Sequence, residues 1–184
     1  IAIVKAEHVD DKFNARFSAR ARKYEYYILN RRSKSAVHHK RITRVKDPLN
    51  VKKMQEAANM LVGENDFSSF RASACQAKTP VTELYSIKLE TIKFGDDLII
   101  KANIHGRAFL HNMVRIIMGT LVEIGTGKEP IEFAKHALEA KDRTKAGPTL
   151  APDGLFFVGV DYKDKGELNH EVYNFQPTVT PESN

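Results

Sequence analysis

The sequence predicts an α+β fold, in which a mixed, mostly antiparallel sheet has helices packed on one face. Segments with the composition and alternation of strands are interleaved with segments that have helical spacing of apolar residues. Two of the strand segments, residues 81–93 and 98–104, are separated by a short connection around Gly95, which predicts an antiparallel hairpin. Residues 108–124 form a helix-length segment that is apolar on almost every side and therefore must be largely buried.

The first predicted elements are strands. Residues 1–4 (IAIV) have the composition of a strand that begins abruptly, which favours the presence of an upstream segment. Residues 23–30 (KYEYYILN) are aromatic and β-branched, which also predicts a strand. Its alternation places three residues on one face: Tyr24, Tyr26 and Ile28. A basic segment follows to about Lys46.

A helix and a compact loop are expected next. Apolar residues recur at helical spacing from Val51 to Leu61, and Gly63 is a natural terminator for that helix. Residues 64–71 (ENDFSSFR) predict a loop anchored by two phenylalanines. The first strand of the hairpin is expected to place three residues on one face: Tyr85, Ile87 and Leu89.

The remaining elements complete the predicted sandwich. Residues 131–140 predict an amphipathic helix, and residues 155–162 (LFFVGVDY) predict a buried strand. From Lys163 onward the chain is polar, and residues 176–184 have the composition of a loose tail.

Basic residues are concentrated in one part of this 184-residue chain, whose net charge is +6. The segment from Arg16 to Lys53 holds 13 of the 29 Lys and Arg residues and only two acids, Glu25 and Asp47. Such a concentration repels itself unless a partner neutralises it, which favours a polyanion-binding surface over a solvated loop. RNA is favoured over a membrane, because these residues lie among tyrosines and strands rather than on an amphipathic helix.

Several classes of protein find no support in the sequence. The single cysteine, Cys75, allows no internal disulfide and fits a reducing compartment. The longest apolar stretch, residues 114–121, is far too short to span a bilayer, so a soluble cytoplasmic protein is expected. No metal site is expected, because Cys75 has no cysteine partner and His38 and His39 are adjacent.

Arg115 is the most informative candidate for a functional residue. It lies in the middle of the apolar segment 108–124, where an unpaired guanidinium would be costly to bury. One interpretation is a structural ion pair or a side chain that reaches the surface. The other is that Arg115 holds a catalytic carboxylate or a phosphate. His111, expected one turn earlier on the same helix face, and Asn112 beside it indicate a face that borders a cleft.

Tyr24, near the start of the predicted strand 23–30, also has two interpretations. Without further information, a half-buried strand tyrosine is the simpler one. The functional interpretation is an aromatic platform for a base that has left its stack, because every base offers a π-face.

Four segments, taken together, resemble the tRNA pseudouridine synthase A family, and they occur in the family's order. They are residues 13–27 (FNARFSARARKYEYY), 63–71 (GENDFSSFR), 108–119 (AFLHNMVRIIMG) and 142–158 (DRTKAGPTLAPDGLFFV). The resemblance implies an isomerase that converts uridine to pseudouridine in the anticodon stem-loop of tRNA. It also implies a homodimer that needs no cofactor or metal.

The resemblance assigns roles to particular residues. Tyr24 matches the tyrosine that packs on the target base, and Arg115 matches the arginine that pairs with the catalytic aspartate. Leu155 and His111 are expected to line the substrate pocket. Contacts with the RNA backbone are expected, from charge and position, at five residues: Arg16, Arg20, Arg22, Lys23 and Arg71.

The sequence departs from the family in one respect: it contains no segment like the GRTDxGVHA motif that carries the catalytic aspartate. We therefore expect residues 1–12 to end a truncated N-terminal domain, 13–163 to form the C-terminal synthase domain, and 164–184 to form a polar tail. On this interpretation the chain alone is inactive. The alternatives are a non-catalytic RNA-binding domain of the same α+β type and a protein-interaction domain with a solvated basic loop.

Overall fold

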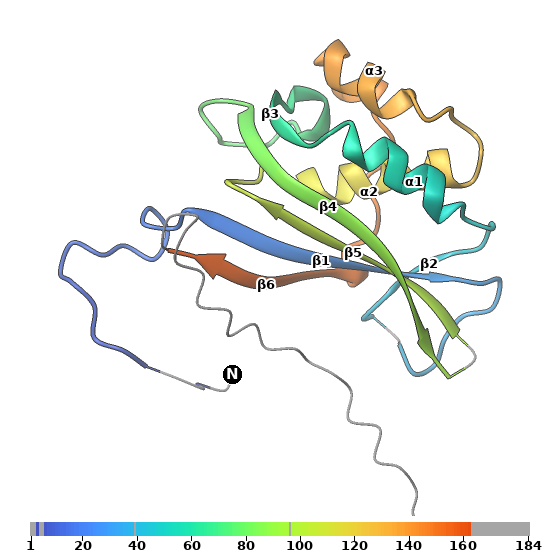
Figure 1. The fold of residues 1–184 in the computed structure, drawn as a ribbon, viewed down its shortest axis with the longest axis horizontal. Coiled ribbons are helices and arrows are strands. Elements are labelled where there is room, and N and C mark those ends of the chain that lie inside the picture. Colours follow the sequence, from blue (N-terminus) through green and yellow to red (C-terminus); the bar gives the residue numbers. More distant parts are fainter. Residues whose placement is uncertain (1–2, 4–5, 39, 96, 163–184) are drawn as a thin grey trace, which may run out of the picture.

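The computed structural model describes residue 3 and residues 6–38, 40–95 and 97–162. Over this part of the chain it forms one sheet with helices on one face, which confirms the predicted α+β class (Figure 1). The elements in chain order are β1 (Ala21–Asn30), β2 (Thr43–Val45), α1 (Val51–Asn59), β3 (Gly63–Asp66), β4 (Val81–Phe94), β5 (Asp97–Gly106), α2 (Met113–Gly125), α3 (Phe133–Ala140) and β6 (Leu155–Asp161).

β1 is the organising strand of the sheet. The strand order is β2-β1-β5-β4-β3, and every pairing is antiparallel except the parallel pair of β1 with β2. The outer edge of β1 is divided between two strands. β6 pairs antiparallel with its first part, from Ala21 to Tyr26, and β2 pairs with Ile28–Asn30. Residues of the predicted strand 23–30 therefore touch three other strands.

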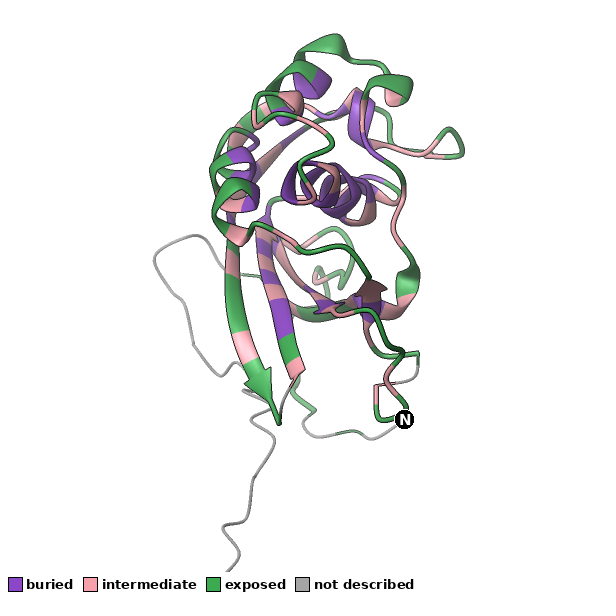
Figure 2. Ribbon diagram, turned by 90° about the vertical axis from the view of Figure 1, so that its right-hand side faces the viewer, coloured by how far each residue is buried: buried purple, intermediate pink, exposed green. Residues whose placement is uncertain are grey.

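The core lies between the sheet and the helices, where α2 is buried along almost its whole length (Figure 2). β1 contributes Tyr26 and Ile28 to this core, and β5 contributes Ile100 and Ile104. The aromatic anchors expected in residues 64–71 are also buried, because Phe67 and Phe70 are fully inaccessible to solvent. Removal of this apolar helix from water is the main favourable contribution to packing the helices against the sheet.

β6 is a strand, but the prediction that it is buried is wrong. Phe156, Phe157 and Val158 are 39%, 58% and 41% exposed. The reason is position, since β6 lies on the outer edge of β1 rather than inside the sheet. An apolar run predicts a strand equally well in either place.

A bulge in β4 changes the predicted alternation, with Tyr85 as the extra residue. Leu84 and Ile87 consequently both lie in the core. The Tyr85 ring instead contacts the ring of His105, with 4.9 Å between centroids. The prediction that Tyr85 shares a face with Ile87 and Leu89 is therefore wrong.

Two helix boundaries also differ from prediction. The apolar helix expected from residue 108 begins at Met113, because Asn112 adopts a left-handed conformation with φ of 61°. The helix expected from Val51 to Leu61 ends at Asn59, and Gly63, its expected terminator, opens β3 with φ of +108°. The predicted strand at residues 1–4 and the tail at 164–184 lie outside the described residues, apart from Ile3, which is in no strand.

Candidate active site

Arg115 is held by neutral acceptors. From the third position of α2, its Nε donates a hydrogen bond to the carbonyl oxygen of Leu150 at 2.6 Å, and Nη1 donates to Asn112 Oδ1 at 2.9 Å. The Leu150 N–H in turn donates to the carbonyl of Arg115 at 3.2 Å. Among the residues that the structure describes, no carboxylate lies within ion-pair distance of Arg115. Its guanidinium is thus fixed in position while its charge is available to an anion.

The segment that carries Leu150, residues 146–151, crosses α2 at very short range and is called the strap below. The Gly147 N–H donates to Thr120 Oγ1 at 2.9 Å. A Cβ atom on Gly119 would lie only 1.7 Å from the carbonyl oxygen of Pro148, so only glycine permits this crossing. The backbone therefore positions the strap, and the strap positions Arg115.

Tyr26 connects the strap to the sheet. Its hydroxyl donates to the carbonyl of Ala151 at 2.6 Å and lies 2.7 Å from Thr43 Oγ1. Burial raises the pKa of Tyr26 to about 12, against the opposing effects of the Thr43 hydrogen bond and the charge of Arg115. Leu155 is the β6 partner of Tyr26 in the sheet. Tyr26 therefore links the strap that holds Arg115 to the strand that carries Leu155.

Tyr24 is half-buried on β1 in an aromatic environment. Its ring packs edge-on against Phe109, at 4.9 Å between centroids, and against Phe157, at 5.3 Å. Burial raises the pKa of Tyr24, and the charge of Arg22 partly opposes that rise. At neutral pH the phenol is consequently uncharged, which suits packing or hydrogen bonding rather than proton removal by a phenolate.

The prediction that His111 shares a helix face with Arg115 is wrong. His111 lies in the loop before α2 and is exposed. Its backbone N–H donates to Cys75 Sγ at 3.4 Å, and its carbonyl accepts a hydrogen bond from Ala72 at 3.0 Å. The residue that accompanies Arg115 is Asn112, whose type is suited to the left-handed turn at the start of α2.

Arg22 and Lys23, which were expected to contact RNA, make well-defined contacts within the protein. Arg22 donates to three backbone carbonyls, those of Ala19, Arg107 and Arg16. Lys23 forms an ion pair with Asp161, with 2.9 Å between Nζ and Oδ1.

The other three residues expected to contact RNA differ in exposure. Arg16 and Arg20 are exposed in the segment before β1, and the Arg16 guanidinium lies 5.6 Å from the centre of the Phe17 ring. Arg71 is half-buried after the 3-10 turn Ser68–Phe70.

The residues that hold Arg115 and the strap differ in how far the sequence indicates them. Asn112 had a local signal, since asparagine before an apolar helix favours a special backbone conformation. Leu150 had none, because it binds Arg115 through its backbone carbonyl. Thr120, which holds the strap by accepting a hydrogen bond from Gly147, had none either, because the two residues are 27 positions apart in the sequence.

Neither a metal centre nor a membrane span is found in the described ranges. No group of three or more His, Cys, Asp or Glu side chains there is arranged to hold a metal ion. None of the helices in the same ranges is long and apolar enough to cross a bilayer.

Comparison with known proteins identifies the family. The family model described as tRNA pseudouridine synthase matches residues 57–163. Several curated relatives are named tRNA pseudouridine synthase A. The one from Nitrosococcus oceani is 49% identical, over 91% of this chain and 63% of its own length. The Ehrlichia canis protein is 46% identical, over 88% of this chain and 64% of its own length. The Haemophilus influenzae protein is 44% identical, over 91% of this chain and 61% of its own length.

The chain therefore spans somewhat less than two thirds of the length of each of these relatives. The family match covers more than half of the chain and includes α2, Arg115, the strap and β6. By this match and by its fold, the chain belongs to the tRNA pseudouridine synthase family.

Proposed function

We propose that this chain forms one wall of the active site of an enzyme that isomerises uridine to pseudouridine in the anticodon stem-loop of tRNA. The reaction breaks the bond between C1′ and N1 of the base and forms a bond between C1′ and C5. The C5 proton is lost and N1 gains one, so substrate and product are isomers. The base must leave the helical stack, because the reacting atoms are inaccessible within it.

The observation that carries the proposal is the state of Arg115. A guanidinium fixed by Leu150 and Asn112, with no described carboxylate beside it, is prepared to receive one. We assign that carboxylate to the catalytic aspartate, supplied by the part of the relatives' length that this chain does not match. An adjacent cation lowers a carboxyl pKa, so Arg115 would keep the aspartate ionised and oriented.

Tyr24 and Leu155 are assigned to the target base. The uncharged ring of Tyr24 would pack on the uracil, as aromatic side chains do on unstacked bases. Leu155, which pairs with Tyr26, would line the same pocket. His111, exposed in the loop before α2, would contact the substrate at the same pocket.

The remaining parts of the proposal concern assembly. The enzyme would act as a cytoplasmic homodimer with tRNA as its partner and would need no cofactor or metal. Residues 1–12 would end a preceding domain, 13–163 would form the synthase domain, and 164–184 would form a tail. Arg16, Arg20 and Arg71 would contact the RNA backbone directly. Arg22 and Lys23 would support the surface around them through their internal bonds.

The test is release of tritium from tRNA labelled at C5 of uridine. The chain would be assayed alone and joined to the segment of the Nitrosococcus oceani relative that it does not match. We expect release only from the joined protein. Release by the chain alone would show that a carboxylate of this chain does the chemistry and would overturn the assignment of Arg115.

A non-catalytic RNA-binding domain predicts a different pattern. The joined protein would bind tRNA but release no tritium. In the joined protein, Lys128→Gln removes an exposed cation that pairs with Glu123 and should leave tritium release unchanged. It serves as the control for a change of net charge away from Arg115.

A further inference from the structure

A cluster of cations lies far from Tyr24 along β1. Residues 31–38 and 40–46, called the basic loop below, belong to a stretch with seven Lys and Arg residues and no Asp or Glu. Five of the cations are exposed: Arg32, Lys34, Lys40, Arg41 and Lys46. Within the described ranges, none of these five forms an ion pair with a carboxylate.

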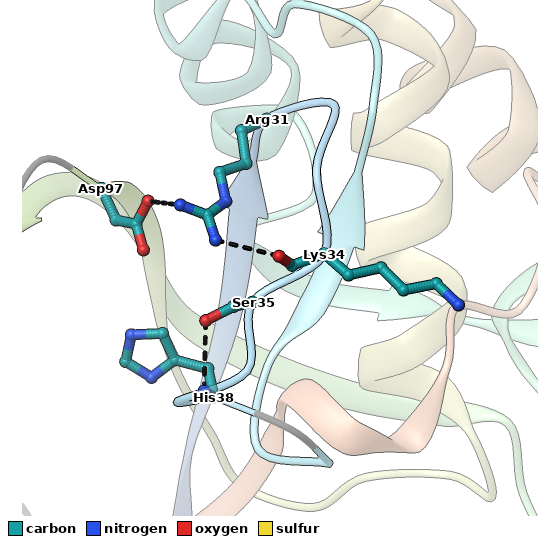
Figure 3. Close-up of polar contacts among 5 residues, drawn as sticks. All are labelled: Arg31, Lys34, Ser35, His38 and Asp97. Atoms are coloured by element: carbon teal, nitrogen blue, oxygen red, sulfur yellow. Dashed lines mark hydrogen bonds and ion pairs between the residues drawn. The ribbon is translucent and has the colours of Figure 1, made fainter.

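The basic loop is attached firmly to the end of the β4–β5 hairpin. The antiparallel register of β1 and β5, continued beyond Leu29 and Ile99, brings Arg31 opposite Asp97, and the two side chains form an ion pair. Arg31 Nη2 also donates to the carbonyl of Lys34 at 3.1 Å. Figure 3 shows this pair at the base of the loop, with the Lys34 ammonium pointing away from it.

Further contacts hold the middle of the loop. The His38 ring packs edge-on against Phe94 of the hairpin, with 4.8 Å between centroids. The His38 N–H donates to Ser35 Oγ at 3.2 Å (Figure 3), and the Arg41 N–H donates to the carbonyl of His38 at 3.0 Å. These contacts restrain the loop before any partner binds and so reduce the conformational entropy that it loses on binding.

We propose that the basic loop is a second binding site for the sugar–phosphate backbone of tRNA, positioned by the Arg31–Asp97 ion pair. Tyr24 lies on β1 and Arg31 directly follows it, seven residues further on, which corresponds to roughly 23 Å at about 3.3 Å per residue. A single nucleotide cannot reach both positions, whereas a folded RNA can. The inference rests on the proposed function only in naming tRNA as the RNA.

The first test removes charge from the loop. The double variant Lys34→Gln with Arg41→Gln changes only exposed side chains, and tRNA binding would be measured by fluorescence anisotropy across a range of salt concentrations. Loss of two phosphate contacts should reduce the slope of log affinity against log salt by about 1.4 to 1.8 and weaken binding at least about tenfold. The matched control, Lys128→Gln with Lys135→Gln, removes two exposed cations from the α3 side of the molecule and should have little effect.

The second test separates the position of the loop from its charge. Asp97→Asn raises the net charge by one, so a simple charge effect predicts tighter tRNA binding. If the ion pair with Arg31 positions the loop, its loss should instead weaken tRNA binding several-fold, although all five exposed cations of the loop are still present. Glu132→Gln, at an exposed position before α3, makes the same change of charge and serves as control. A thermal melt of each variant would confirm that it is folded.

The outcomes distinguish this inference from the proposed function. If the joined enzyme releases no tritium but the loop variants still weaken tRNA binding, the inference stands and the proposed function fails. If tritium is released and the loop double variant binds tRNA like its control, the inference is overturned. The inference would also be overturned if the loop double variant lost binding to vesicles of anionic phospholipid but kept its binding to tRNA.

Discussion

Gly119→Ala tests how strongly the strap is held against α2. Helix propensity alone predicts that alanine in a helix interior stabilises by about 1 kcal/mol relative to glycine. The added Cβ, however, would lie 1.7 Å from the Pro148 carbonyl oxygen, and ordinary contact requires at least 3.4 Å, so the backbone of the strap must move. That movement breaks the hydrogen bond of Gly147 to Thr120 and both hydrogen bonds between Arg115 and Leu150.

The magnitude follows from these losses. Two neutral hydrogen bonds contribute about 1 kcal/mol each and the bond from the charged Arg115 about 2, so we expect a net destabilisation of about 3 kcal/mol after the gain in propensity. For a chain of this size that corresponds to a fall in Tm of roughly 6–12 °C.

The assay is thermal and urea unfolding followed by circular dichroism. Gly125→Ala, at the end of the same helix, is the matched control. There the added Cβ meets flexible side-chain atoms of Met54 and Leu49, which can move, so a smaller loss is expected. An unchanged or raised Tm for Gly119→Ala would refute the close crossing of the strap.

Three further predictions concern single side chains. The pKa of Tyr26 is about 12 in the folded protein and about 10 in the unfolded chain, so its contribution to the free energy of unfolding is complete below pH 10. That free energy should fall by about 2 kcal/mol as the pH rises from about 10 to about 12. In urea unfolding measured across this pH range, Tyr26→Phe should lack that part of the fall. Ser69 has a fully buried hydroxyl with no hydrogen-bond partner among the residues that the structure describes, so Ser69→Ala should be neutral or stabilise by about 1 kcal/mol. Thr120→Ala, which loses the bond from Gly147, should instead destabilise by about 1–2 kcal/mol, and equal Tm shifts would contradict this difference. In the joined enzyme, Tyr24→Leu, which removes the aromatic ring proposed to pack on the uracil, should reduce turnover far more than tRNA affinity, and equal losses in the two measurements would argue against a position beside the base.

The sequence was sufficient for elements whose pattern is local. Alternation in residues 23–30 predicts β1, and the short connection at Gly95 predicts the β4–β5 hairpin that the structure contains. The apolar character of α2 likewise predicts its burial. Arg115 could be singled out because one charged residue among buried aliphatic ones requires an explanation.

Features that depend on distant contacts could not be predicted in this way. β2 is only three residues long and exists through its pairing with β1. The exposure of β6 follows from which edge it joins, and hydrophobic periodicity does not contain that information. The hydrogen bonds that fix Arg115 come from the backbone of the strap, whose path across α2 is set by the absence of a side chain at Gly119.

The most direct test of the account is Arg115→Gln in the joined enzyme, because glutamine keeps a polar side chain but removes the charge. Single-turnover tritium release and tRNA affinity would be measured on the same preparation. We expect release to slow at least about a hundredfold, since a misplaced or protonated catalytic carboxylate has effects of this size, while affinity changes less than about twofold. Unimpaired release by Arg115→Gln would contradict the central claim that this arginine holds the catalytic aspartate.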